Sequence, residues 1–206
     1  MAKLNSEVDT TSASLYHVHY LPTICVLKED GSEIDRLVGY CRAPEYMQQV
    51  EDYLAGRNTL ASMLVEEPAK AESADFVYRL GEKLSYHGLF DEGSKRYLRV
   101  VSLDPENKTG HVDDALYSLA RMSRRAKDFV QARTYAQTIL DRYSSGDMMK
   151  PAFLEVGIDL KKAGSLPEAR KVFLDYAKRF PGDEDAPYAR EQADTIAVQL
   201  RRPPGS

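Results

Sequence analysis

The stretch Leu80–Pro105, LGEKLSYHGLFDEGSKRYLRVVSLDP, decides the fold, because its spacing of small and aromatic residues returns twice further along the chain. Three of its positions recur after steps of 39 and 37 residues. They hold Gly81, Ala120 and Gly157; Gly93, Ala132 and Ala169; and Tyr97, Ala136 and Phe173. Such a recurrence indicates stacked units, each of which buries its apolar face only against its neighbours.

Each recurrence predicts a pair of antiparallel helices. Small residues at the first two positions let the helices approach closely, and the third position fills the space between them. Pro105 and Pro181 stand where second helices should end, because proline does not continue a helix. The spacing resembles the tetratricopeptide repeat, whose period is 34 residues before extra loop residues are added. The resemblance implies an α-solenoid of three repeats, over 74–107, 113–146 and 150–183.

A further apolar pattern follows the last repeat. Ala189, Ala193, Ile196 and Leu200 recur at helical spacing. Repeat arrays need a terminal element with a polar outer face, so we predict a cap helix over 185–201. Residues 202–206 are predicted to form a frayed tail.

The N-terminal part has the pattern of a β-hairpin with helices on either side. Thr23–Leu27 is an apolar, β-branched run, Asp30-Gly31 is a turn signal, and Ile34–Val38 is a second, alternating run. Because the first run is apolar on both faces, we expect a sheet that is covered on both sides. Ala43–Leu54 has helical spacing, and Asp9 is placed to cap a short helix that ends at Leu15.

The change from mixed to purely helical patterning places a boundary at residue 57. The unit 1–57 is followed by a linker, 58–73, whose first part has a helical pattern that Pro68 is expected to break. Units this small are marginally stable alone. We therefore expect the N-terminal unit to be completed by upstream sequence, by the helical region, or by a second copy in a homodimer.

The N-terminal unit resembles the second half of a thioredoxin fold, over about residues 7–56. The resemblance rests on Val18-His-Tyr-Leu-Pro22-Thr23, followed by the hairpin and the closing helix. It implies that Pro22 follows a cis peptide bond and that Leu21, Pro22 and Thr23 line a substrate groove. The Cys-x-x-Cys motif of that family is absent, and so is the first half of the fold, which carries that motif in the family.

The two cysteines are not placed to form a disulfide. A turn at Asp30-Gly31 pairs Cys25 near Arg36, whereas Cys41 lies beyond the second strand. A disulfide requires close approach of the two Cα atoms. Cys25 is interpreted as a small apolar core residue.

In tetratricopeptide proteins the first helix of each repeat lines a concave groove. By this correspondence the groove has an acidic edge, a basic middle and an apolar patch. Its predicted residues are Tyr78, Glu82, Tyr86, Tyr117, Arg121, Arg124, Arg125, Leu154, Ile158, Lys161 and Lys162. Tyr78 and Glu82 stand where family members that grip a C-terminal carboxylate begin an Asn/Lys/Arg set, so that clamp is absent. We expect a protein or peptide partner with an acidic segment; the alternative is a solvated helix face.

Composition and motifs argue against several other classes of protein. Lys and Arg number 28 against 32 Asp and Glu, so the formal net charge of −4 offers no basic excess for nucleic acid. The sequence shows no signal peptide and no apolar run of membrane-spanning length, so we expect a cytoplasmic protein without a membrane partner. Phosphate-loop and hydrolase motifs are lacking, and His17-Val-His19 has no evident third metal ligand. We therefore expect no catalytic residues, metal or cofactor.

The fold prediction is a partial thioredoxin-like α/β unit followed by an all-α solenoid. Its resemblance to bacterial thioredoxin–repeat proteins implies a non-enzymatic, chaperone-like or adaptor molecule that binds client polypeptides. The first alternative is a thiol–disulfide oxidoreductase whose catalytic half lies upstream of this chain. The second is a structural scaffold with a fixed partner.

Overall fold

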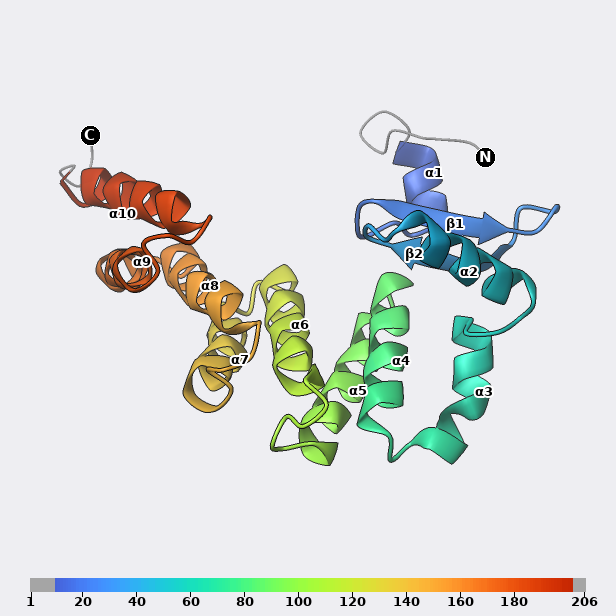
Figure 1. Ribbon diagram of the computed structural model, residues 1–206. Coiled ribbons are helices and arrows are strands. Elements are labelled where there is room, and N and C mark those ends of the chain that lie inside the picture. The colour runs from blue at the N-terminus through green and yellow to red at the C-terminus, as the bar shows by residue number, and fades with distance from the viewer. Residues whose placement is uncertain (1–9, 202–206) are drawn as a thin grey trace. The chain divides into compact units, whose positions relative to one another are not determined.

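The structure, a computed structural model, describes residues 10–201, so Asp9 and the predicted tail lie outside the described residues. The chain divides into two compact units, unit 1 over 1–103 and unit 2 over 104–206 (Figure 1). Unit 1 combines a two-stranded sheet with helices, and unit 2 is a succession of helices. The compact units thus divide later in the chain than residue 57, where the type of secondary structure changes. Within 10–201, no helix has the length and apolar character needed to cross a membrane.

Unit 1 begins with α1 (Thr10–Leu15) and a hairpin of β1 (Thr23–Leu27) and β2 (Glu33–Val38), which pair antiparallel. The Asp30 side chain accepts hydrogen bonds from the backbone and the hydroxyl of Ser32, which fixes the turn. Cys25 lies opposite Arg36, as the position of the turn predicted. Cys25 and Cys41 are both free thiols.

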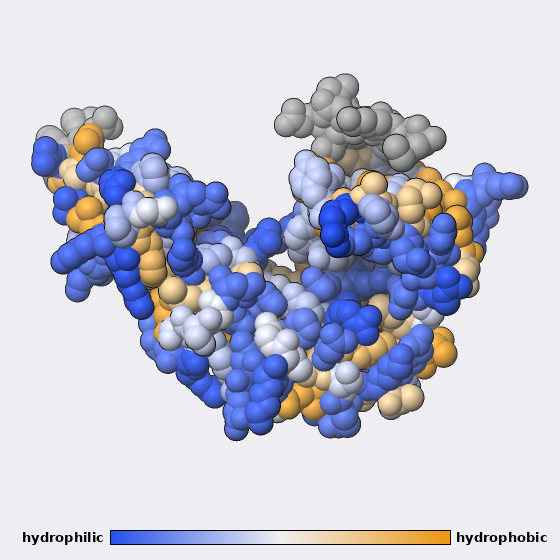
Figure 2. Space-filling view, in the orientation of Figure 1, coloured by the Kyte–Doolittle hydropathy of each residue, from blue (hydrophilic) through white to orange (hydrophobic). Residues whose placement is uncertain are grey.

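The two strands differ in burial, so the expectation of a sheet covered on both sides is wrong for β1. Every residue of β1 is at least partly exposed, whereas Asp35, Arg36 and Leu37 of β2 are buried. Because successive side chains point to opposite faces of a strand, β2 is covered on both sides, whereas β1 is only half-buried. Apolar atoms are accordingly visible at the surface over the hairpin end of unit 1 (Figure 2).

Two helices lead from the hairpin to the first helix pair. α2 (Ala43–Leu54) buries Tyr53 but leaves Met47 exposed. α3 (Leu60–Lys70) begins after Thr59, whose hydroxyl accepts a hydrogen bond from the Ser62 N–H. The prediction that Pro68 breaks this helix is wrong, because Pro68 lies inside α3, near its C-terminal end. A proline there removes one backbone donor, and the helix continues to Lys70.

The first helix pair consists of α4 (Ala74–Tyr86) and α5 (Phe90–Leu103), which pack side by side (Figure 1). The predicted close approach is present, since a Cβ on Gly81 would lie 3.0 Å from the Tyr97 ring. A Cβ on Gly93 would lie 2.5 Å from Ser85 Oγ. An apolar cluster packs α3 against α4 and comprises Leu60, Met63, Phe76, Leu80 and Leu84.

Unit 2 contains α6 (His111–Arg125), α7 (Phe129–Arg142), α8 (Met149–Lys162), α9 (Leu166–Arg179) and α10 (Ala186–Arg201). Consecutive helices pack against each other, which is the arrangement of a helical repeat. The small positions are buried as predicted: Ala120 and Ala132 have no exposed surface, and a Cβ on Gly157 would lie 2.9 Å from the Phe173 ring. α10 packs on α9 through four buried residues, Ala186, Ala189, Ala193 and Ile196.

Candidate functional site

A buried carboxylate holds the hairpin of unit 1 to its helices. Asp35 has no exposed surface. Its Oδ2 accepts hydrogen bonds from Lys83 Nζ at 2.7 Å and from the Leu60 N–H at 2.6 Å. Its Oδ1 accepts one from the Arg36 N–H at 2.7 Å and lies 3.1 Å from His87 Nε2. One side chain of β2 therefore contacts the start of α3 and the end of α4.

The pKa values of this cluster follow from burial and charge pairing. Burial acts to raise the pKa of Asp35, but the His87 hydrogen bond and the Lys83 ammonium together hold it below its ordinary value. Burial lowers the pKa of Lys83, and the attraction of Asp35 opposes that shift. The ammonium also lies 4.1 Å from the centre of the Tyr53 ring. The carboxylate and the ring thus replace part of the water that the ammonium loses.

Arg36 connects the segment before β1 to the end of α4. Its guanidinium pairs with Glu33 at 2.6 Å. It also donates to the backbone carbonyls of Tyr16, His17 and Tyr86. Because Tyr86 ends α4, these bonds join the N-terminal segment to the first helix pair. Within unit 1 the hairpin therefore contacts the helical region, which is one of the three expected ways of completing the N-terminal unit.

The residues predicted for the thioredoxin-like groove lie in that segment. The Leu21–Pro22 peptide bond is cis, as the resemblance implies. The Leu21 side chain is 69% exposed, and the Thr23 hydroxyl donates to the Tyr20 carbonyl at 2.6 Å. The Tyr20 ring meets Tyr86 edge-on at a centroid distance of 5.7 Å. The cis bond therefore presents an exposed leucine beside an aromatic contact with α4.

The histidines of His17-Val-His19 take structural positions. His19 packs edge-on against Phe90 at 5.1 Å between centroids. The His17 carbonyl accepts from Arg36. Across residues 10–201, no three side chains of the His, Cys, Asp or Glu type are arranged to hold a metal ion.

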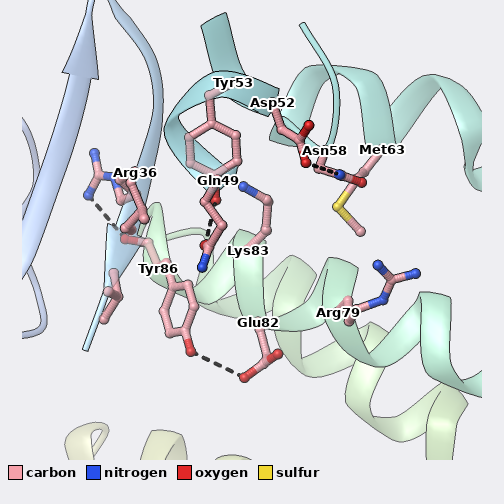
Figure 3. A pocket seen from close by; sticks show the side chains of 12 residues that line it. Arg36, Gln49, Asp52, Tyr53, Asn58, Met63, Arg79, Glu82, Lys83 and Tyr86 are labelled. Atoms are coloured by element: carbon pink, nitrogen blue, oxygen red, sulfur yellow. Dashed lines mark hydrogen bonds between the residues drawn. The ribbon is translucent and has the colours of Figure 1, made fainter. Parts of the chain in front are cut away.

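A cavity of about 400 Å³ lies beside Lys83 in unit 1. Its walls come from β2, α2, α3, α4 and the link that carries Asn58 (Figure 3). The side chains that supply its chemistry are Gln49, Tyr53, Met63, Arg79, Lys83 and Tyr86. We call this the Lys83 cavity.

The acidic residues of the Lys83 cavity already accept hydrogen bonds from other side chains of the protein. Asp52 accepts hydrogen bonds from Arg57 and Asn58, which hold the pKa of Asp52 below its ordinary value. Glu82 accepts the Tyr86 hydroxyl at 3.1 Å. Burial and the Glu82 charge raise the pKa of Tyr86, so its hydroxyl stays protonated and remains a donor.

In unit 2, the predicted groove residues of α6 and α8 form a polar network. Arg124 Nε lies 2.6 Å from Asp159 Oδ1, and Arg124 Nη1 lies 2.7 Å from Glu155 Oε2. The Tyr117 hydroxyl donates to Glu155 at 3.2 Å, and burial followed by the Glu155 charge raises the pKa of Tyr117 to about 12. Lys161 Nζ donates to Gln192 of α10 at 2.8 Å. Arg124 thus pairs its charge inside unit 2.

The remaining predicted groove residues differ in exposure. Arg121, Arg125 and Lys162 are exposed, Ile158 is half-buried, and Leu154 is buried with 7% of its surface exposed. In unit 1, Tyr78 is half-buried with its ring 5.9 Å from that of Tyr97, whereas Glu82 and Tyr86 line the Lys83 cavity. The surface charge predicted for the middle repeat therefore comes from Arg121 and Arg125.

Sequence reasoning did not identify Asp35, Lys83, His87 or Gln49. One signal was available, because Asp35 shares a strand face with Leu37, and an acid on an apolar face requires a partner. The identity of that partner was not readable, since Lys83 and His87 are 48 and 52 residues away in sequence.

Comparisons with known proteins add no family assignment. A scan against protein-family models found no match to this chain, and a search of curated proteins found none either.

Proposed function

We propose that this chain is a non-enzymatic interaction protein that binds polypeptide segments, composed of a thioredoxin-like half-domain and three tetratricopeptide repeats with a cap helix. The observation that carries the proposal is the burial of Gly81, Ala120 and Gly157 at equivalent places in three consecutive helix pairs. Stacked helix pairs of this kind present extended surfaces that suit peptide binding. The cis bond before Pro22 supports the thioredoxin-like part of the proposal.

The environment of the Cys25 thiol does not favour redox chemistry at that residue. Burial, aided by the Glu33 charge, raises the pKa of the Cys25 thiol. A raised pKa lowers the fraction of the reactive thiolate. The alternative of an oxidoreductase depends on a Cys-x-x-Cys half upstream of this chain, and reduction of insulin by this chain itself would contradict our proposal.

Binding can be tested with a permanently unfolded, acidic polypeptide such as reduced and carboxymethylated α-lactalbumin. We expect the chain to bind it, and the binding to weaken as salt rises. Reversal of two exposed charges of α6, Arg121→Glu with Arg125→Glu, should abolish the salt-sensitive part. The matched control is Lys171→Glu with Lys178→Glu, which reverses two exposed charges on α9, a second helix of a pair. Absence of binding, or equal loss in both double variants, would refute the proposal.

A further inference from the structure

The Lys83 cavity has hydrogen-bond donors that the contacts among residues 10–201 do not use. An ammonium carries three N–H donors, and Lys83 gives one to Asp35. Arg79 uses Nε on Asp75, which leaves the terminal nitrogens of its guanidinium. The Gln49 carbonyl oxygen accepts the Tyr53 hydroxyl at 3.5 Å, which leaves the amide nitrogen of Gln49 for another partner. Arg79 and Lys83 lie one helical turn apart on α4 and both line the cavity (Figure 3).

Lys83 can share its charge because Asp35 does not depend on it alone. The carboxylate also receives the N–H groups of Leu60 and Arg36 and a hydrogen bond with His87. The side chain of Lys83 is 13% exposed, so a ligand acceptor would meet it with little competing water.

We propose that the Lys83 cavity binds the side-chain carboxylate of an acidic residue in an extended peptide, which accepts hydrogen bonds from Lys83 and the Gln49 amide, while Arg79 farther along the cavity adds positive charge. Leu37 and Met63 line the same cavity and offer apolar contact to the residues on either side of that acid. That the natural ligand is a polypeptide rests on the proposed function, whereas carboxylate recognition rests on the cavity itself.

Charge limits the ligand to a single negative charge. Asp35 pairs with Lys83, and two further acids, Asp52 and Glu82, line the cavity. A phosphate dianion would be repelled more strongly by these carboxylates than a ligand with one negative charge would be. A neutral amide would leave the Lys83 and Arg79 donors only partly compensated.

The direct test is an NMR titration of the isotope-labelled full chain with the capped tripeptide Ac-Leu-Glu-Leu-NH₂. We expect saturable shifts of the side-chain amide signals of Gln49 and Asn58. Ac-Leu-Gln-Leu-NH₂ should bind about tenfold more weakly, since it lacks the charge-assisted bonds. Equal affinity of the two peptides, or tighter binding of Ac-Leu-pSer-Leu-NH₂, would overturn the proposal. Tighter binding of Ac-Leu-Gln-Leu with a free C-terminus would assign the cavity to a chain end and would also overturn it.

Two variants, each with a matched control, test whether Arg79 and Gln49 contribute to binding of the Glu peptide. Arg79→Gln should weaken the Glu peptide roughly three- to tenfold, whereas Arg99→Gln, a similarly exposed arginine on α5 paired with Glu72, should leave affinity unchanged. Gln49→Ala should weaken binding, whereas Gln137→Ala, on α7 of unit 2, should not. Equal effects of variant and control would contradict the assigned contacts.

The two proposals fail separately. If the unfolded polypeptide binds but the Glu peptide does not shift the Gln49 and Asn58 signals, the carboxylate assignment fails and the proposed function stands. If the Glu peptide binds the cavity but the unfolded polypeptide does not bind, the proposed function fails and the carboxylate assignment stands.

Discussion

Units 1 and 2 both contain antiparallel helix pairs, but different kinds of contact complete them. In unit 2, small buried residues such as Ala120 and Ala132 recur along the chain, and α10 covers the last pair. In unit 1, a hairpin whose β1 is only half-buried is fastened to α4 by the charges of Asp35, Lys83 and Arg36. Repeated apolar packing tolerates the loss of single contacts better than one buried ion pair does, so the two units should respond differently to substitution.

The largest expected effect is that of Asp35→Asn in unit 1. The variant keeps the shape of the side chain but leaves the Lys83 ammonium buried without a counter-charge, so we expect a loss of about 3–5 kcal/mol in unfolding free energy. Hydrogen exchange should accelerate in β2 and α4 and stay unchanged in α8 and α9. The control is Asp75→Asn, an exposed acid paired with Arg79, for which at most about 1 kcal/mol is expected.

The pH dependence of stability sharpens this prediction. The folded-state pKa of Asp35 lies below its ordinary value, so its contribution is complete above the unfolded pKa of about 3.9. It is lost as pH falls through the lower, folded-state pKa. Stability curves of the natural chain and of Asp35→Asn should therefore converge at acidic pH, and a constant gap down to the lowest pH would show that the carboxylate charge is not responsible.

A second, smaller loss is expected from Arg124→Gln in unit 2. The substitution leaves Asp159, whose side chain has no exposed surface, without its cation. We expect about 3 kcal/mol, near the low end for a broken buried pair, because the Arg124 side chain keeps 14% exposure. Exchange should now accelerate in α6 and α8, while β2 stays protected. Accelerated exchange in β2 would argue against independent units.

Gly93→Ala tests the helix crossing of unit 1 against those of unit 2. Ala132 and Ala169 occupy the equivalent place without exposed surface, whereas a Cβ on Gly93 would lie 2.5 Å from Ser85 Oγ and 3.1 Å from the Gly81 carbonyl. Overpacking should outweigh the gain in helix propensity, for a net loss of about 1–2 kcal/mol in thermal or urea unfolding.

Ser85→Ala combined with Gly93→Ala should recover part of that loss, because the hydroxyl is the closest obstacle. Full additivity of the two single effects would show that the hydroxyl is not the cause.

The smallest effect concerns the Asp183 carboxylate of unit 2. Hydrogen bonds from Lys150 and then Tyr176 lower the pKa of Asp183 to about 2. Lys150→Met should raise that pKa toward the ordinary value, as followed by NMR titration of the side-chain carbonyl, with little change in stability because the Lys150 side chain is half exposed. An unchanged pKa would assign the shift to Tyr176, which Tyr176→Phe checks.

The sequence predicted the elements of both units because they depend on periodic signals. The positions equivalent to Gly81 locate the helix crossings, and Asp30-Gly31 places the turn that pairs Cys25 with Arg36. The burial of β1 was predicted wrongly because apolar residues show which strand could be covered and not whether a second layer is present. Pro68 was misjudged because a proline removes only its own backbone donor, and α3 continues beyond it to Lys70.

The candidate site was largely unpredictable for a different reason. Tyr86 and Glu82 were predicted to line a groove of the repeats, and in the structure they line the Lys83 cavity of unit 1. Gln49 and Lys83 have no local pattern that marks them, since their roles arise from side chains distant in sequence. The cavity exists only where β2, α2, α3 and α4 come together.

The hydrogen bonds of Asp35 to residues later in the sequence also determine when β2 can be buried during translation. Its hydrogen-bonding partners Leu60, Lys83 and His87 are translated after it, the last of them 52 residues later. A nascent hairpin therefore leaves the ribosome with an acid on the face that it must bury, and it acquires a place to bury that acid only when the end of α4 has emerged. Ribosome-bound chains halted before His87 should keep β2 accessible to protease, whereas chains released beyond Leu103 should protect it.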